Sequence, residues 1–411
     1  MKFSIFTPTH RFNHLPRLEA SLRRQTLQDF EWVIVPNGPM LGQKPPVSLS
    51  QARVVPPRDT TRNEIGYLKK HACLSCRGEI LVEVDHDDEL TPDALEELAA
   101  AFADGADFAY SNFCNVQEDG SAYTFGEAYG WRSRPFELDG KQYTEQLSFP
   151  PSPAAFSKIW YAPNHVRAWR RDFYARIGGH NESMRVLDDQ EILARTYLNG
   201  TIKHIDKPLY IYHMHPGNTC YGEENKTIQE QTLELHDRYI YPLVERWCEL
   251  EGLRKIDLCG GHSKPAGYES IDIQNADIVA NLDETWPIES GSVGVFRAHD
   301  ALEHLRNPIH VMKEAYRCLA PNGWFLIFVP STDGRGAFQD PTHVSFWNSN
   351  SFWYYTKAET AKYINTPVRF QLNRIKNYYP TEWHQTHHIL YTKADLVKLV
   401  EGERPPGLVE I

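Results

Sequence analysis

The chain has 411 residues, of which 41% are hydrophobic and 24% are charged, a composition typical of a globular protein with two or three domains. Its net charge of −11 argues against sequence-independent binding to nucleic acid, which requires a basic surface, although a local basic groove would be compatible with it. No apolar run approaches the roughly 18–20 residues of a membrane span. Seven cysteines without framework spacing and the lack of a signal-peptide pattern lead us to expect a cytoplasmic protein with reduced thiols.

The first 36 residues have the pattern of a strand, a helix and a second strand. Apolar residues at 3–6 and 30–35 predict the strands, and a leucine stripe over residues 15–22 predicts the helix between them. This order and spacing indicate a βαβ unit with parallel strands, and ligands of open parallel sheets bind at the carboxyl ends of the strands. Those ends carry Thr7, Pro8, Thr9 and Asn37.

A third apolar strand, at residues 81–84, ends in the acidic turn DHDD of residues 85–88. Carboxylates this close repel one another and are costly to remove from water. A divalent cation such as Mg²⁺ or Mn²⁺, itself a partner for a diphosphate, would compensate them. Alternatively, the turn is a solvated cap of the helix that begins near residue 91, and the turn alone does not decide between these interpretations.

Two segments beside this strand could shape the same site. Lys69 lies on a helix expected over residues 65–76, so its ammonium group could contact a phosphate, or it could be an ordinary surface charge. Residues 118–157 are rich in proline, glycine and aromatic side chains with weak periodicity, which predicts a long excursion that shapes an acceptor site.

Two later pairs of polar residues could also contribute. Asp188 and Asp189 open an amphipathic helix, where one carboxylate could act as a general base, or both could simply cap the helix. A strand over residues 207–214 leads to His213 and His215, which could complete a metal site, although isolated histidines are more often not ligands.

In the order and rough spacing of these motifs, residues 1 to about 220 resemble glycosyltransferase family 2, whose members have the GT-A, Rossmann-like α/β fold. The motifs that carry the resemblance are T-x-x-x-R from Thr7 to Arg11, the acidic turn, Gly178-Gly179, Asp188-Asp189 and the segment of residues 212–215. The resemblance implies a metal-dependent, inverting transfer of a sugar from a nucleoside-diphosphate sugar to an acceptor hydroxyl.

The same resemblance assigns roles to individual residues. The nucleotide sugar would be bound by Thr7, Pro8, Thr9, Arg11, Asn37, Lys69, Asp85 and Asp188. The metal, Mn²⁺ or Mg²⁺, would be held by Asp85, Asp87 and His215, with His213 as the less favoured third ligand. Asp189 would be the general base. A UDP-sugar is the donor that we expect first, but Asn37 stands where the family has an acid, and an amide does not exclude other bases by charge.

The second half has the outline of a nucleoside-binding α/β domain. Residues 228–250 predict a connecting helix, after which a strand over residues 255–258 leads to Gly260 and Gly261. These glycines would allow close approach of a ligand, and Asp272, at the end of the next strand, could bind two ribose hydroxyls. Further strands are expected at 277–282, 293–298, 324–329, 370–378 and 388–392, the last two as a hairpin, with a helix at 308–319.

Residues 252 to about 360 resemble the class I S-adenosylmethionine-dependent methyltransferases, which also have a Rossmann-like fold. The matching segments are 257–261 (DLCGG), Asp272, 281–282 (NL), 303–305 (EHL) and the turn of residues 319–323. The resemblance implies that S-adenosylmethionine is bound by Asp257, Gly260, Gly261, Asp272, Asn281 and Leu282. Adjacent glycines and Asn281, in place of the family's acid, depart from its pattern, and an NAD-binding domain is disfavoured because G-x-G-x-x-G is missing.

Taken together, these features predict a GT-A domain over residues 1–222, a connecting helix over 223–251 and a methyltransferase-like domain over 252–411. In one alternative, the second domain is non-catalytic and binds the acceptor or a partner. In another, the first domain is a nucleotide-sugar hydrolase or pyrophosphorylase, which Asp188-Asp189 disfavours. The acceptor would be a glycan or another hydroxyl-bearing molecule, with nucleic acid disfavoured by the charge. Residues 336–347 either line a pocket, with Asp340 or His343 as a base, or form a packed loop.

Overall fold

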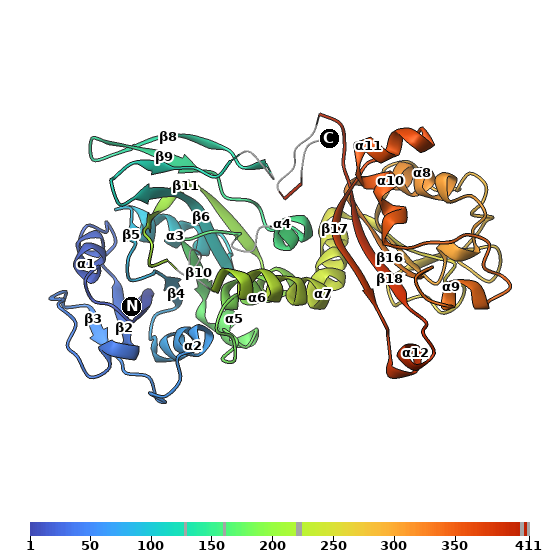
Figure 1. Cartoon of the computed structure of the whole chain (residues 1–411). Helices are drawn as coiled ribbons and strands as arrows, with labels where there is room; N and C mark the ends of the chain where they lie inside the picture. Colours follow the sequence, from blue (N-terminus) through green and yellow to red (C-terminus); the bar gives the residue numbers. More distant parts are fainter. Residues whose placement is uncertain (127–129, 159–161, 219–223, 403–406, 409–411) are drawn as a thin grey trace. The chain divides into compact units, whose positions relative to one another are not determined.

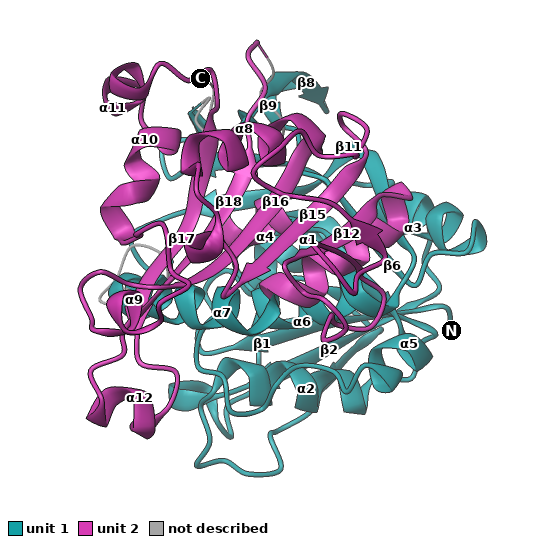
Figure 2. Ribbon diagram, turned by 90° about the vertical axis from the view of Figure 1, so that its right-hand side faces the viewer, with its two compact units in different colours: residues 1–151, 159–239 teal, residues 152–158, 240–411 magenta. Residues whose placement is uncertain are grey.

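The computed structural model describes residues 1–126, 130–158, 162–218, 224–402 and 407–408. The chain forms two compact units, residues 1–151 with 159–239, and residues 152–158 with 240–411 (Figure 2). Helix α7 (Glu224–Glu251) contributes residues to both units. The expected boundary at residues 222 and 223 lies outside the described residues. In the described part of the chain, no helix is long and apolar enough to cross a membrane.

The first unit is built on a mixed sheet of 11 strands (Figure 1). Its main path runs in the order β3 (Ala52–Val54), β2 (Phe30–Pro36), β1 (Phe3–Thr9), β4 (Ile80–Glu83), β10 (Arg167–Arg170), β6 (Phe108–Gln117), β11 (Ile202–Met214) and β5 (Glu89–Leu90). Strands β7 (Ala122–Tyr123), β8 (Ser133–Leu138) and β9 (Lys141–Gln146) extend it from β6. Because β1 to β4 are parallel, their carboxyl ends lie at one edge of the sheet.

Helices cover this sheet and confirm the expected βαβ unit. Its helices are α1 (Leu15–Arg23), α2 (Ile65–Ser75), α3 (Ala94–Ala103), α5 (Arg171–Arg176), α6 (Asp188–Asn199) and the 3-10 turn η1 (Gly38–Met40). The leucine stripe of α1 is fully buried, and every residue of β2 is buried. Burial of successive residues is typical of a parallel strand that is covered on both faces.

The second unit is built on a seven-stranded sheet. The order is β14 (Ile278–Val279), β13 (Glu269–Asp272), β12 (Arg254–Leu258), β15 (Val293–His299), β16 (Leu319–Pro330), β18 (Tyr391–Lys398) and β17 (Phe370–Tyr378). The strands from β14 to β16 are parallel, and β18 is antiparallel to both of its neighbours, which confirms the late strand pair. The structure corrects two strand bounds, since β14 has only two residues and β18 begins at Tyr391 rather than at residue 388.

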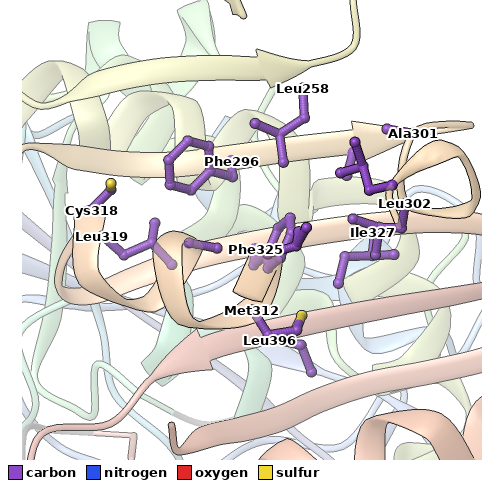
Figure 3. Packing of buried hydrophobic residues seen from close by; sticks show 14 of the residues in the cluster. Leu258, Phe296, Ala301, Leu302, Met312, Cys318, Leu319, Phe325, Ile327 and Leu396 are labelled. Carbon is purple, nitrogen blue, oxygen red and sulfur yellow. The ribbon is translucent and has the colours of Figure 1, made fainter. Parts of the chain in front are cut away.

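Alternating side chains of β16 enter two different cores. Phe325 and Ile327 pack with Met312 of α8 (Pro308–Cys318), as Figure 3 shows. Their neighbour Leu326 packs on the other face with Val244 of α7. Because successive side chains of a strand point to opposite faces, the sheet is covered by helices on both sides. The predicted α/β, Rossmann-like fold class is therefore confirmed.

Short helices complete the second unit. They are α4 (Pro153–Lys158), α9 (Gly336–Gln339), α10 (Trp353–Thr356), α11 (Ala358–Ala361), α12 (Glu382–Thr386), η4 (Leu302–His304), η5 (Ser349–Phe352) and η6 (Lys362–Ile364). Residues 336–347 form α9 and a following loop in which Trp347 is buried and Phe346 is exposed.

Candidate functional site

Thr7 and Asn37, two of the residues predicted to bind the nucleotide sugar, make hydrogen bonds that hold the carboxyl ends of β1 and β2 together. Thr7 is fully buried, and its Oγ1 donates to the carbonyl of Val84 at 2.8 Å while accepting from Trp32 Nε1 at 3.0 Å. The backbone N–H of Asn37 donates to the carbonyl of Thr9 at 2.8 Å. Thr7 therefore fixes the edge of the sheet, whereas Asn37 and the exposed Arg11 lie where a ligand can reach them.

The acidic turn contains three carboxylates with three different environments. Asp87 Oδ2 lies 2.8 Å from His215 Nε2. The Nδ1 atom of His215 accepts from the N–H of Gly217, so Nε2 carries the proton and donates to Asp87. Burial opposes ionisation of Asp87, but the imidazoles of His86 and His215 outweigh it, and the pKa of Asp87 is lowered.

The other two carboxylates differ from Asp87. Asp88 is fully buried, accepts from Tyr210 Oη at 2.7 Å and from the N–H of His213 at 2.8 Å, and has a pKa raised by burial and by its acidic neighbours. Asp88 thus ties β11 to the turn. Asp85 has 38% of its side chain exposed, and its Oδ2 lies 3.9 Å from His165 Nε2.

These distances bear on the predicted metal ligands. Oxygen and imidazole donors suit a divalent cation, and Asp87 and His215 are already together. The ligand atoms of Asp85, Asp87 and His215 are not all within 4.8 Å of one another. The exposed side chain of Asp85 would have to turn away from His165 to join them. The imidazole of His213 lies 2.8 Å from Glu89 instead, so His215 is the histidine of this pair whose imidazole contacts the acidic turn.

A buried ion network lies behind the turn. Lys69 Nζ is 2.6 Å from Glu83 Oε1 and 3.1 Å from Asp188 Oδ2, and all three side chains are buried. Burial alone would lower the pKa of Lys69, but Asp188 and Glu83 raise it well above its usual value. The ammonium group of Lys69 therefore holds two carboxylates in the interior and is not a surface charge.

The two aspartates that open α6 have different partners. Asp189 Oδ2 accepts from Arg167 Nη1 at 3.0 Å, and 19% of its side chain is exposed, compared with 5% for Asp188. Burial raises the pKa of Asp188 to about 6. Burial also opposes ionisation of Asp189, but Arg167 and Lys69 outweigh it and lower the pKa. Asp189 thus has the lower pKa and the more exposed side chain of this pair, and it is the carboxylate that an acceptor hydroxyl could reach.

Sequence reasoning missed several residues of this site. Glu83 is the one charged residue of an otherwise apolar strand, and because a buried charge needs a partner, that pattern could have identified it. Arg167 lies in the strand β10, of sequence RAWR, where no pattern distinguishes it from Arg170. His165 links Glu83 to Asp85, at 3.7 and 3.9 Å, and had no signal of its own. Further imidazoles gather at the turn, with ring centroids 5.1 Å apart for His10 and His86 and 5.3 Å apart for His14 and His215.

In the second unit, the residues predicted to bind S-adenosylmethionine lie at the carboxyl ends of β12, β13 and β14. A Cβ atom on Gly260 would stand 2.2 Å from Asp257 Oδ2, so the turn after β12 has no room for a side chain there. Gly261 has φ +49°, and a Cβ atom there would stand 3.7 Å from Asp272 Oδ2. The glycines and Asp272 thus form an open cradle of the kind a nucleoside requires.

The remaining predicted residues support or flank this cradle. Asp257 is buried and accepts from Arg297 Nη1 at 2.7 Å. Leu282 is buried in the core of the unit. Asn281 is exposed, and its Oδ1 accepts from the N–H of Asp283 at 3.1 Å. Gly260, Gly261 and Asp272 therefore fit the predicted cofactor. Asn281 departs from the family's pattern, because it has an amide where the family has an acid.

Comparisons with known proteins agree with both resemblances. Residues 4–159 match the family described as glycosyl transferase family 2, and residues 256–327 match a methyltransferase domain. The O-antigen biosynthesis protein RfbC of Myxococcus xanthus is 26% identical over 218 residues, which are 50% of this chain and 15% of that protein.

Among solved structures, S. aureus TarS matches 53% of this chain and 37% of its own, with 19% identity and a TM-score of 0.41. Its fragment 1–349 in complex with UDP-GlcNAc matches 53% of this chain and 60% of its own, with 19% identity and a TM-score of 0.38. The family matches confirm the two resemblances: the chain carries a glycosyltransferase domain of family 2 in its N-terminal half and a methyltransferase domain in its C-terminal half.

Proposed function

We propose that the first unit transfers a sugar from a nucleoside-diphosphate sugar, with a UDP-sugar as the first donor to test, to an acceptor hydroxyl with inversion. One observation carries this proposal. A continuous series of contacts runs from Asp85 through His165, Glu83 and Lys69 to Asp188, whose neighbour Asp189 is ionised and reaches the surface. The same buried ion network would thus position both the cation-binding turn and the general base.

In this proposal the chemistry of the chain's own residues is simple. The acceptor hydroxyl donates its hydrogen bond to Asp189, which takes the proton as the hydroxyl oxygen attacks the anomeric carbon. The bond from that carbon to the diphosphate breaks on the opposite face, which inverts the configuration. Arg167 holds the Asp189 carboxylate in a fixed orientation through its 3.0 Å contact.

The proposed metal is Mn²⁺ or Mg²⁺, held by Asp85, Asp87 and His215. When bound, it would neutralise the charge of the departing nucleoside diphosphate. Thr7, Pro8, Thr9, Arg11, Asn37 and Asp188 would bind or position the nucleotide sugar. Lys69 would act indirectly, because its ammonium group is occupied by Glu83 and Asp188.

For the second unit we propose binding of S-adenosylmethionine, supported by the cradle of Gly260, Gly261 and Asp272. When bound, this cofactor supplies a methyl group that is activated for transfer. A glycan is the acceptor that we propose to test first, since the similar region of RfbC belongs to a protein named for O-antigen biosynthesis. The alternative of a non-catalytic second domain is tested by the cofactor titration described below.

The base assignment is tested with Asp189→Asn. We expect nucleotide release from a UDP-sugar in the presence of Mn²⁺ and a glycan acceptor to fall by roughly 10²–10⁴-fold, with nucleotide affinity unchanged, because only the proton acceptor is removed. Asp104→Asn, at the exposed end of α3, is the matched control and should keep full activity. Loss of nucleotide binding in a folded Asp189→Asn protein would show that Asp189 is not the base.

A further inference from the structure

A second cluster of possible metal ligands lies in the methyltransferase unit and contains none of the residues predicted to bind the cofactor. Glu303 belongs to η4, which follows β15, and His343 lies in the loop after α9, which follows β16. One ligand atom from each of Glu303, His304 and His343 lies within 4.8 Å of the others. Because β15 and β16 are parallel neighbours, this cluster lies at the carboxyl edge of the sheet, where ligands of such folds bind.

Backbone hydrogen bonds hold together the two loops that carry this cluster. The N–H groups of Val344 and Ser345 both donate to the carbonyl of Glu303, at 2.8 and 3.0 Å. Ser345 Oγ also donates to the carbonyl of Leu302 at 2.8 Å. These three bonds join positions about 40 residues apart in the chain and fix His343 beside Glu303.

The Glu303 carboxylate is the strongest sign of a missing partner. Only 1% of the residue is exposed, and among the described residues neither of its side-chain oxygens has a hydrogen-bond partner. His343 Nε2 lies 4.0 Å from Glu303 Oε1, which is too far for a hydrogen bond. A buried carboxylate without a partner is costly, so it must gain either a proton or a cation.

The two imidazoles are oriented as metal ligands are. His343 Nδ1 lies 3.1 Å from the carbonyl of Ala337, and His304 Nδ1 lies 3.3 Å from the carbonyl of Thr342. A carbonyl only accepts, and the Thr342 hydroxyl, 3.2 Å from His304 Nδ1, donates to Asp340 at 2.7 Å, so both Nδ1 atoms carry the proton and Nε2 of the neutral ring keeps a lone pair. Histidines that bind metals usually donate their other ring N–H to a carbonyl or carboxylate in this way.

We propose that Glu303, His304 and His343 form a site for a divalent transition-metal ion, with Zn²⁺ as its representative. One carboxylate and two imidazoles suit such an ion better than Mg²⁺ or Ca²⁺, which prefer oxygen ligands throughout. Three protein ligands leave a coordination position for water or for an oxygen atom of a second molecule bound at the same edge. The site is separate from the metal site proposed in the first unit and does not depend on it.

Zinc binding to the full chain tests this site. The Asp87→Asn substitution removes a proposed metal ligand of the first unit. The variant protein is treated with EDTA and then titrated with Zn²⁺ by calorimetry. We expect about one equivalent of Zn²⁺ to bind, and Glu303→Gln or His343→Ala added to this protein to weaken that binding at least 100-fold. His310→Gln, a histidine of α8 outside the cluster, should leave it unchanged.

Two outcomes would overturn the proposal. One is a Zn²⁺ stoichiometry and affinity that Glu303→Gln does not alter, and the other is a lack of Zn²⁺ binding by the Asp87→Asn protein, in which case Glu303 holds a proton instead. Glu303→Gln has nearly the shape of the native side chain, so its fold is retained and can be verified by circular dichroism. The visible absorption of Co²⁺ in place of Zn²⁺ should change with either variant, because it reports the ligands directly.

Discussion

Three buried charged residues, Lys69, Glu83 and Asp188, stabilise the first unit. Glu83 lies in the mostly apolar strand β4 and Asp188 opens helix α6, both residues are buried, and Lys69 is the cation that both contact. Burying charges costs several kcal/mol per ion, and removing one member of such a group leaves the others uncompensated. Lys69 is therefore a structural residue whose position also orients the candidate catalytic helix α6.

Lys69→Met should lower the free energy of unfolding of the first unit by about 3–5 kcal/mol, because two buried carboxylates lose their cation. Urea unfolding followed by intrinsic fluorescence measures this loss. Lys70→Met is the matched control: its Nζ lies 3.2 Å from the partly exposed Glu182, so the loss should stay within about 1 kcal/mol. Equal losses in the two variants would contradict the proposed network.

His299, at the end of β15, predicts a pH dependence of stability. Burial, followed by the charges of Arg297 and Lys393, lowers the pKa of His299 to about 3, and its Nδ1 accepts from Arg297 Nη2 at 2.8 Å. The unfolded chain, with an ordinary histidine pKa near 6.5, binds this proton first as the pH falls. Stability contributed by the neutral imidazole is therefore present above about pH 6.5 and is lost towards pH 3.

Between pH 7 and pH 5 this loss should be on the order of 1–2 kcal/mol for the second unit. His299→Gln should remove that part of the slope when unfolding free energies are measured at both pH values. His262→Gln, at an exposed loop position, should keep the native slope. A slope unchanged by His299→Gln would show that His299 does not titrate as described.

At the scale of elements, periodicity predicted most of the structure. The runs at residues 3–6, 30–35 and 81–84 correspond to β1, β2 and β4, because mostly apolar strands fit the interior of a sheet that is covered on both faces. The place of β10 between β4 and β6 was not predictable, since pairing between distant strands depends on three-dimensional packing that no local pattern records.

One missed element did have a local signal. Strands β8 and β9 form a hairpin inside the segment expected to be a long excursion, and their two-residue loop is Asp139-Gly140, with φ +52° and +76°. Asp-Gly favours the turn in which both residues have positive φ, so the sequence did contain a hairpin signal. The alternating polar and apolar residues around it were too weakly periodic to draw attention to it.

The turn after β12 is the element on which cofactor binding depends. Titration calorimetry should show that the native chain binds S-adenosylmethionine and S-adenosylhomocysteine. Gly260→Ala should weaken this binding at least 10-fold, because its Cβ atom would stand 2.2 Å from Asp257 Oδ2 and the turn would have to shift. Ser263→Ala, an exposed residue of the same turn, should bind as the native chain does. If the native chain binds neither compound, the second unit is a non-catalytic module.

At the scale of the whole chain, both units place their candidate sites at the carboxyl edge of parallel strands. The sequence could predict these edges, because strand order along the chain fixes where the motifs fall. It could not predict which side chains meet. Hydrogen bonds between two loops, from Val344 and Ser345 to Glu303, bring His343 beside Glu303, and Asp85 lies beside His165 rather than beside His215. Such partners depend on rotamers and loop conformations that become visible only in the folded molecule.

The central claim, a metal-dependent nucleotide-sugar site in the first unit, is tested most directly by calorimetric titration of UDP with Mn²⁺ and then with EDTA. We predict that UDP binds at least 10-fold more tightly with Mn²⁺ and that Asp87→Asn removes this difference, because the variant loses a metal ligand. Equal UDP affinity with Mn²⁺ and with EDTA, or a Mn²⁺ effect that survives in the Asp87→Asn protein, would contradict the claim.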